Sequence, residues 1–388
     1  MKVLIISWED PSLAERGDAI YTRNLIEGLN ELKCRPDIIY YGNNVVQDSN
    51  GLYEIGESQF INFSARAKFL VGLSFLPGMV ANRKRREYME LVAKICSQKS
   101  YDFVIINHFK MSFCLPMLGN QRVLYFSHNN EAGLLWNNVT HERSTWRKLI
   151  YLQDWMKTRF YEDRFLSRVN MVSVISAGDK GELARRTNKP IRVLRPIINT
   201  SNVEASCRSD PKKLMVVGSY TWRPKAENII ELAKCFEKYN LLQLGLQLVI
   251  VGKMNQVTKK MITKIPGIKC IGFVEDLTPW YRNCDISIVP ETMGGGFKLK
   301  LSEAASYGKV IYGIRDAVNS DDFVDGLHLL LFDDIDSLVK GLKEDIMFSK
   351  RDYSSLRKAA KKLVQTKFTR EEFARSLKAL VLDEPINS

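Results

Sequence analysis

The sequence predicts an α/β protein of two domains, each built on a doubly wound parallel sheet. Short runs rich in β-branched residues alternate with amphipathic stretches of helical period. This alternation stops in a polar stretch at 200–213, which we interpret as a linker, and then restarts. The length of 388 residues also exceeds what one ordinary core needs, and it suits two domains of roughly 150–200 residues each.

The first domain is expected over residues 1–199. Its candidate strands are short apolar runs at 3–8, 37–41, 103–107, 122–126, 171–175 and 191–194. Helical period predicts a helix over 21–32, with Leu25, Leu29 and Leu32 on one face, and a longer helix over 143–168. Short strands separated by helices indicate βαβ units around a parallel sheet.

The second domain is expected over residues 214–365. Its candidate strands lie at 214–217, 247–251, 268–271, 285–289 and 310–312, and its candidate helices at 227–239 and 297–306. The remaining residues, 366–388, are predicted to form a helix that could pack back on the first domain. Two such domains usually close around a ligand held at the carboxyl ends of their strands.

Composition narrows the class of protein. The chain is 45% hydrophobic and 26% charged, as soluble globular proteins are. Nothing at the start resembles a signal peptide, and the longest apolar stretch, 69–80, is far shorter than the ~20 residues that span a bilayer. The seven cysteines are scattered without a CxxC pair, which indicates reduced core thiols rather than a zinc site. We therefore expect a cytoplasmic protein, either free or peripheral on the inner face of the membrane.

The formal net charge of +13 calls for an anionic partner, and charge alone allows lipid, a phosphorylated substrate or nucleic acid. Residues 69–86 join an apolar stretch to the basic run Arg83–Arg86, a pattern of attachment to an anionic membrane surface. A buried loop and a helix with a solvated basic end explain the same pattern, and both interpretations stay open. The basic helices look like ordinary amphipathic helices, so no nucleic acid is expected.

One constellation stands out, in the run PETMGGGFKLKLSEA at 290–304. A predicted strand ends at Pro290, the glycines follow, and a helix begins near Phe297. Glycines let backbone N–H groups approach an anion, and the helix start adds unpaired donors and a positive dipole end. The three glycines are Gly294, Gly295 and Gly296.

Charged residues accompany this turn. Lys298 and Lys300 add positive charge, and Glu303 lies about one and a half turns into the helix. A carboxylate there could accept hydrogen bonds from sugar hydroxyls. The run matches neither GxxxxGK[ST] nor GxGxxG, and a flexible surface turn is the alternative. The position after a buried strand favours phosphate binding.

The run GGGFKLKLSEAASYGKVIYGI resembles a motif of the retaining, GT-B-fold glycosyltransferases of family 4, a type found in bacterial glycan biosynthesis. VVGSYTWRPKAENIIEL (216–232), LVIVGK (248–253) and IGFVEDLTPWYRNCDISIVP (271–290) resemble the same family in the same order, and YFSHNNE (125–131) and YEDRFLSRVNMVSVISAGDKGEL (161–183) are compatible with it. The resemblance implies two Rossmann-like domains that face each other across a cleft. It also implies transfer of a hexose, with retention, from a nucleotide diphosphate sugar to a hydroxyl of a glycan or lipid-linked acceptor.

The resemblance assigns roles to individual residues. Glu303 would hold the ribose hydroxyls, and the backbone at Phe273 and Val274 would flank the base. Arg223 and Lys225 would neutralise the diphosphate, although the family's basic pair is spaced differently and either could be a solvated loop charge.

Gly17 would let the loop after the first strand approach the donor phosphate; a plain turn glycine is nearly as good an interpretation. Gly294, Gly295, Gly296, Phe297 and Lys300 complete the donor-binding prediction.

The chain departs from the family at one position. Many members carry a second glutamate eight positions before the one matched by Glu303, and here that position is Gly295. Glu291 lies four residues earlier. It is a candidate for sugar contact, with an ordinary strand-end carboxylate as the alternative.

His128 and Lys298 are the predicted catalytic residues. A strand-end histidine could hydrogen-bond the donor sugar or stabilise the reacting centre, and Lys298 would stabilise the leaving diphosphate. The other three histidines, at 108, 141 and 328, are expected to be structural. The aspartate pairs at 321–322 and 333–334 look like solvated loops, so no metal or cofactor is expected.

By analogy with the family, retention would follow a front-face mechanism. The rival hypotheses are a GT-B epimerase and a catalytically degenerate GT-B protein that only binds nucleotide or membrane.

Overall fold

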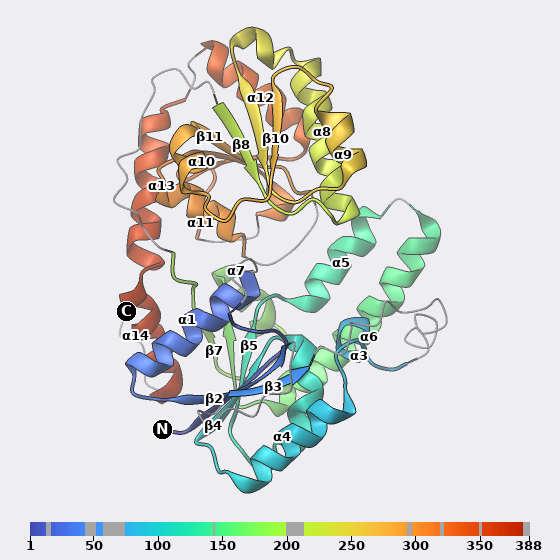
Figure 1. The fold of residues 1–388 in the computed structure, drawn as a ribbon, viewed down its shortest axis with the longest axis vertical. Helices are drawn as coiled ribbons and strands as arrows, with labels where there is room; N and C mark the ends of the chain where they lie inside the picture. The colour runs from blue at the N-terminus through green and yellow to red at the C-terminus, as the bar shows by residue number, and fades with distance from the viewer. Residues whose placement is uncertain are drawn as a thin grey trace. The chain divides into compact units, whose positions relative to one another are not determined.

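The computed structural model describes residues 1–12, 17–42, 52–56, 74–142, 144–198, 213–292, 297–318, 322–348 and 351–382, with the backbone alone at 52–56, 141 and 317 (Figure 1). By its internal contacts the chain divides into two units. Unit 1 comprises Met1–Ile197 and Arg370–Ser388, and unit 2 comprises Ile198–Thr369. Of the predicted linker, only Lys213 is among the described residues.

Unit 1 contains a parallel sheet of seven strands in the order β3-β2-β1-β4-β5-β6-β7. The strands are β1 (Val3–Ser7), β2 (Pro36–Gly42), β3 (Leu52–Gly56), β4 (Phe103–Asn107), β5 (Val123–Ser127), β6 (Met171–Val174) and β7 (Ile191–Val193). Every residue of β1, β4 and β5 is buried, because helices cover both faces of a doubly wound sheet. The six predicted strands are confirmed, whereas β3, with a glutamate at its centre, was missed.

The helices of unit 1 are α1 (Gly17–Glu31), α3 (Gly78–Ala81), α4 (Arg86–Gln98), α5 (Glu131–His141), α6 (Thr145–Arg168), α7 (Ala177–Ala184) and α14 (Arg370–Leu382), with a 3₁₀ segment at Phe109–Met117. The helix α1 begins four residues before the predicted start. Gly17 is therefore its first residue rather than part of the loop, which corrects the prediction. The apolar period could not reveal a polar first turn, in which Asp18 adds negative charge at the positive end of the helix.

The last helix, α14, lies beside α1 in unit 1 (Figure 1). A Cβ atom on Gly28 of α1 would lie 2.8 Å from side-chain atoms of both Phe373 and Leu377, so glycine permits this close packing. Arg370 adds ion pairs with Glu27 and Glu31 at 2.8 and 2.5 Å. The C-terminal helix is thus integrated into unit 1.

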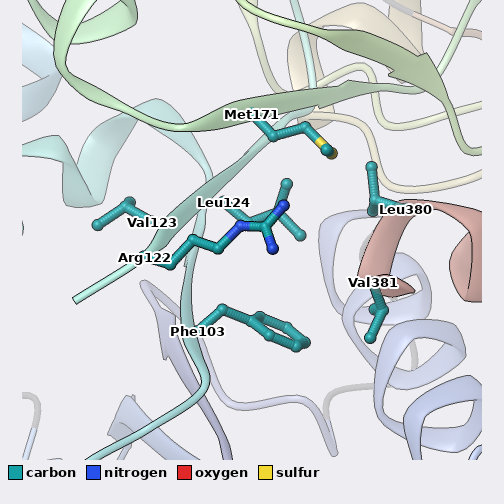
Figure 2. A pocket seen from close by; sticks show the side chains of 7 residues that line it. All are labelled: Phe103, Arg122, Val123, Leu124, Met171, Leu380 and Val381. Carbon is teal, nitrogen blue, oxygen red and sulfur yellow. The ribbon is translucent and has the colours of Figure 1, made fainter. Parts of the chain in front are cut away.

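A small pocket lies where α14 meets the sheet. Figure 2 shows its lining, formed by Phe103, Arg122, Val123, Leu124, Met171, Leu380 and Val381. Phe103, Val123 and Met171 are the first residues of β4, β5 and β6. The pocket therefore lies at the amino ends of these strands, the edge opposite to the one where α/β sheets bind ligands.

Unit 2 contains a parallel sheet of six strands in the order β10-β9-β8-β11-β12-β13. The strands are β8 (Lys213–Val217), β9 (Gln247–Val251), β10 (Ile268–Gly272), β11 (Ile286–Val289), β12 (Val310–Ile314) and β13 (Leu330–Phe332). The helices are α8 (Arg223–Lys238), α9 (Gln256–Ile262), α10 (Thr278–Asn283), α11 (Leu299–Ser306), α12 (Ile335–Phe348) and α13 (Tyr353–Lys367), with 3₁₀ segments at Leu241–Leu244 and Arg315–Ala317. The five predicted strands are confirmed and β13 was missed.

Each sheet reverses its strand order once, between β1 and β4 in unit 1 and between β8 and β11 in unit 2. The backbone is tight beside the second reversal. Gly252, after β9, has φ +134°, and a Cβ atom there would lie 1.7 Å from the carbonyl oxygen of Gly218 after β8. Only glycine tolerates this conformation and approach. Ligands of doubly wound sheets bind at such reversals, so the carboxyl ends of these strands are where a site is expected.

None of the helices in the described part of the chain combines the length and the apolar run that crossing a bilayer requires.

Candidate functional site

At the strand reversal of unit 2, a buried carboxylate meets three lysines. Glu291 follows Pro290 at the end of β11, and its residue is 1% exposed. The Nζ atom of Lys300, in the first turn of α11, donates to Glu291 Oε1 and to the carbonyl oxygen of Val217, 3.3 Å away at the end of β8. Lys300 therefore joins the two strands between which the order reverses. We call Glu291, Lys225, Lys298 and Lys300 the lysine–glutamate cluster.

The cluster carries more positive than negative charge. Burial acts to raise the pKa of Glu291, but the charges of Lys300, Lys225 and Lys298 outweigh it, so the pKa lies below its usual value and the carboxylate is ionised. Burial, followed by the charge of Lys300, lowers the pKa of Lys225, whereas Glu291 opposes this shift. Three cations around one carboxylate leave a surplus that a multiply charged anion would balance.

Two buried oxygens of this region have no hydrogen-bond partner within the described ranges. They are Oε2 of Glu291 and the hydroxyl of Tyr220, whose pKa is raised by burial and by the charge of Glu291. Leaving a buried polar atom unpaired costs about 1–3 kcal/mol. A ligand hydroxyl that donates to Glu291 would remove this cost, which favours the sugar-contact interpretation of Glu291 over a plain strand-end carboxylate.

The start of α11 supplies further donors. Its N-cap residue is Lys298, whose side chain has no acceptor atom to offer the first-turn N–H groups, although its carbonyl oxygen accepts the N–H of Leu301 at 2.9 Å. Those groups and the positive end of the helix dipole are suited to an anion. The predicted glycine turn, Gly294, Gly295 and Gly296, lies outside the described residues, so its role stays a prediction.

Glu303 is half-buried on α11 and accepts a hydrogen bond of 3.3 Å from the hydroxyl of Tyr281. Burial raises its pKa, while the bond from Tyr281 and the charge of Lys300 oppose the shift. The Tyr281 ring stacks on Tyr307 at 4.9 Å. Glu303 is therefore a positioned carboxylate that retains acceptor capacity for hydroxyl groups.

The other residues predicted to bind the donor lie in different surroundings. Phe273 is 44% exposed, with Lys253 Nζ 4.5 Å above its ring, and Val274 is half-buried beside it. The ring of Phe297 stacks on Phe368 at 5.4 Å, so its side chain packs against α13's end. Of these three residues Phe273 is the exposed one, and the Lys253 ammonium lies over its ring.

The two members of the predicted basic pair, Arg223 and Lys225, lie in different environments. Arg223, the first residue of α8, is exposed and pairs with Glu227 at 2.6 Å. Lys225 is half-buried, and its pKa responds to Lys300 and Glu291. The structure thus brings Lys225 to the cluster, while Arg223 lies on the helix surface.

At the strand reversal of unit 1, His128 follows β5 and is buried. Its Nε2 lies 2.8 Å from Asn107 Oδ1, and its Nδ1 lies 3.3 Å from Asp18 Oδ1. Asn107 Nδ2 donates to Thr22, which orients the amide oxygen toward the histidine. Both ring nitrogens thus lie close to side-chain oxygens of Asn107 and Asp18.

His108, which we expected to be structural, lies in the same place. It follows β4 with φ +86°, a conformation that is strained for a residue other than glycine. Its ring centroid is 5.0 Å from that of His128, and its Nε2 is 3.7 Å from Glu131 Oε1. Burial, with the charge of Lys110, lowers its pKa well below the usual value. His108 is therefore neutral at physiological pH.

Two carboxyl groups whose pKa values are shifted in opposite directions lie beside these histidines. Burial acts to raise the pKa of Asp18, but the hydrogen bond and charge of His128 outweigh it and hold the pKa well below its usual range. Burial and the charge of Glu162 raise the pKa of Glu131 to about 8. Lys110 Nζ lies 3.8 Å from Asp18 Oδ2. We call Asp18, His108, Lys110, His128 and Glu131 the histidine cluster.

The histidine cluster combines an ionised carboxylate, a protonated carboxyl group, a cation and two imidazoles. Paired groups whose pKa values are pushed apart are typical of sites that handle protons and hydroxyl groups. His108 and His128 each directly follow a fully buried five-residue strand, a signal that could have identified His108. Lys110 and Glu131 lie two and three residues after these histidines, whereas Asp18 comes from the start of α1.

Gly17 is exposed at the start of α1, next to Asp18. Of the other two histidines, His328 accepts a local hydrogen bond from the N–H of Val324 through Nδ1 at 2.9 Å. The side chain of His141 lies outside the described part of the chain.

Comparison with known proteins agrees with this picture. Residues 211–346, about a third of the chain, match the family model described as Glycosyl transferases group 1. A search of curated proteins found no significant match.

Three solved structures are similar along nearly the whole chain. Sucrose-phosphate synthase from Thermosynechococcus elongatus gives a TM-score of 0.73 at 17% sequence identity, over 99% of this chain and 98% of that one. HepE from Anabaena in complex with UDP and glucose gives 0.66 at 12%, over 99% and 100%. The pneumococcal O-GlcNAc transferase GtfA in complex with UDP and GlcNAc gives 0.65 at 11%, over 99% of each. The two doubly wound sheets and these likenesses give the chain the GT-B fold, and the family match covers the lysine–glutamate cluster.

Proposed function

We propose that the protein is a glycosyltransferase that moves a hexose from a nucleotide diphosphate sugar to a hydroxyl of a glycan or lipid-linked acceptor, with retention. The observation that carries the proposal is the lysine–glutamate cluster at the start of α11, inside the segment that matches a glycosyltransferase family. Structural neighbours crystallised with UDP and a sugar support it.

In this proposal the diphosphate binds at the start of α11, where Lys298, Lys300 and Lys225 balance its charge. Preorganised charge of this kind stabilises a leaving group that gains negative charge in the transition state. Glu303 accepts hydrogen bonds from the ribose, and Glu291 accepts one from the transferred sugar through its unpartnered oxygen. The exposed ring of Phe273 flanks the base.

The reaction breaks the bond between the anomeric carbon and the diphosphate and forms one to the acceptor oxygen. With retention by a front-face route, the acceptor proton passes to a diphosphate oxygen on the same face. In this proposal His128, held by Asn107 and Asp18, stabilises the reacting centre. We propose that this proceeds without a metal ion, and that the protein works in the cytoplasm.

The test is turnover of a panel of UDP-, GDP- and dTDP-sugars with a range of acceptors, with the product anomer assigned by NMR. Calorimetry with the preferred nucleotide should show weaker binding for Lys298→Ala and Glu303→Ala, while the exposed Lys340→Ala serves as a matched control. Nucleotide binding without turnover of any donor would contradict the transferase, and unchanged affinity in both site variants would contradict the site.

A further inference from the structure

The helix α6 has an apolar face that is turned to solvent. Its inward side is buried through Thr158, Glu162, Phe165 and Leu166. Its other side carries five large apolar residues that are 47–72% exposed: Trp146, Leu149, Ile150, Met156 and Phe160. Scattered exposed apolar residues are normal, but five on one helix face mark an interaction surface.

At 3.6 residues per turn, these five side chains fall within an arc of about 120°. The same arc contains Lys157, Arg164 and Arg168, of which both arginines are exposed. We call these eight residues the α6 stripe. The arc also contains the exposed Gln153 and Ser167, and no acidic residue of α6 falls within it.

The three acidic residues of α6 are engaged by the protein instead. Asp154 accepts the N–H of Gly78 at 2.9 Å, and Asp163 pairs with Arg186 at 2.7 Å. Glu162 is buried and caps α5 by accepting the N–H groups of Glu131 and Ala132. Negative charge on α6 is thus neutralised on its inner side and edges, while the stripe faces outward.

Contacts on the sides of α6 away from the stripe hold the helix in unit 1. Trp136 of α5 is 44% exposed and packs on Trp155 of α6 at 4.8 Å between ring centroids. Phe75 is 96% exposed and precedes Gly78, whose N–H bonds to Asp154 of α6. Figure 1 shows α5 and α6 side by side as a helix pair.

We propose that the α6 stripe attaches the protein to the surface of an anionic lipid bilayer. Tryptophan, phenylalanine and leucine beside lysine and arginine, without exposed acidic residues among them, are the composition of a helix that lies in the membrane interface. The apolar side chains enter the acyl boundary, and the basic ones contact lipid phosphates.

This surface differs from the segment 69–86 that the sequence indicated. Within that segment, Arg83 stacks over the ring of Trp8 at 5.0 Å, and Arg86 pairs with Glu90 at 2.7 Å. The basic run therefore does not present one common face. Residues 69–73 lie outside the described ranges.

The experiment is flotation of the whole protein with vesicles of equal parts phosphatidylglycerol and phosphatidylcholine, compared with phosphatidylcholine alone. We expect binding to the anionic vesicles that weakens as salt is raised. The double variant Trp146→Ala, Phe160→Ala should bind roughly tenfold more weakly through lost apolar burial. Arg164→Glu, Arg168→Glu should bind about tenfold more weakly through lost attraction.

Matched controls lie in unit 2, where Val257 and Phe348 are 70% and 62% exposed. Val257→Ala, Phe348→Ala and the exposed pair Lys259→Glu, Lys260→Glu should bind as the wild type does. Vesicles with brominated acyl chains should quench tryptophan fluorescence, and Trp146→Phe should keep binding while losing part of that quenching. This last variant distinguishes contact through α6 from contact elsewhere.

Absence of binding to anionic vesicles would overturn the proposal, as would stripe variants that bind normally or an unchanged quenching in Trp146→Phe. Sedimentation that shows a dimer abolished by Trp146→Ala, Phe160→Ala would assign the face to a second copy and equally overturn it. Because these assays use no donor or acceptor, their outcome is independent of whether the proposed glycosyl transfer is correct.

Discussion

The two strand reversals carry clusters of different chemistry. In unit 2, three lysines surround one ionised carboxylate beside a helix start, an arrangement with surplus positive charge. In unit 1, two histidines and a lysine are matched by Asp18 and Glu131, one ionised and the other protonated. The same topological position thus carries surplus positive charge in one unit and, in the other, two imidazoles beside carboxyl groups whose pKa values are shifted in opposite directions.

The strongest test of this division is Lys300→Ala. The change leaves Glu291 as a buried charge without its closest partner, which should destabilise unit 2 by about 3–5 kcal/mol and abolish nucleotide affinity. Chemical unfolding and calorimetry measure the two effects. Lys300→Ala, Glu291→Gln should recover much of the stability but not the affinity. Retained affinity in the single variant would contradict the anion-binding role.

His128→Ala should act on turnover instead of binding. Loss of one donor at a reacting centre costs about 10²–10³ in kcat. Steady-state kinetics and calorimetry together should show a lower kcat with an unchanged Kd for the nucleotide. If Kd changed as much as kcat, the histidine cluster would act on nucleotide binding as well, and the two clusters would not have separate roles.

Glu131→Gln should change how stability depends on pH. The folded-state pKa of about 8 lies above the unfolded value of 4.5, so the folded state binds the proton more tightly. This contribution is fully present below about pH 4.5 and is lost as pH rises toward 8, by a few kcal/mol. Glutamine keeps the neutral form at all pH values, so its stability curve should be flatter. Identical curves for variant and wild type between pH 5 and 8 would show that Glu131 titrates normally.

The smallest predicted effect is a difference in nucleotide affinity between variants of two neighbouring cations, Arg223 and Lys225. Arg223→Ala removes an exposed ion pair and should change nucleotide affinity by less than about 1 kcal/mol. Lys225→Ala removes charge from the cluster and should weaken binding about tenfold. Calorimetry on both variants checks this order, and the reverse order would move the diphosphate toward the α8 surface.

Much of the lysine–glutamate cluster could be predicted because Glu291, Lys298 and Lys300 follow one another along a single strand end, turn and helix start. The histidine cluster was predicted only through His128. Glu131 lies close to it in the sequence, at the start of α5, whereas Asp18 at the start of α1 and the His108–Lys110 segment after β4 are remote along the chain. The α6 stripe was hidden as well, because the helical period does not tell which of two apolar faces a helix buries.

By itself the sequence determined the α/β class, the two sheets with eleven of their thirteen strands, and the segment that carries the proposed diphosphate site. These follow from local patterns, since burial on both faces requires uninterrupted apolar strands and a strand–turn–helix keeps its donors together. Only the tertiary structure decided which charged side chains meet, that Lys225 rather than Arg223 joins Glu291, and that Glu131 is protonated. Those properties depend on burial and on distances between segments remote along the chain, which no single stretch of sequence specifies.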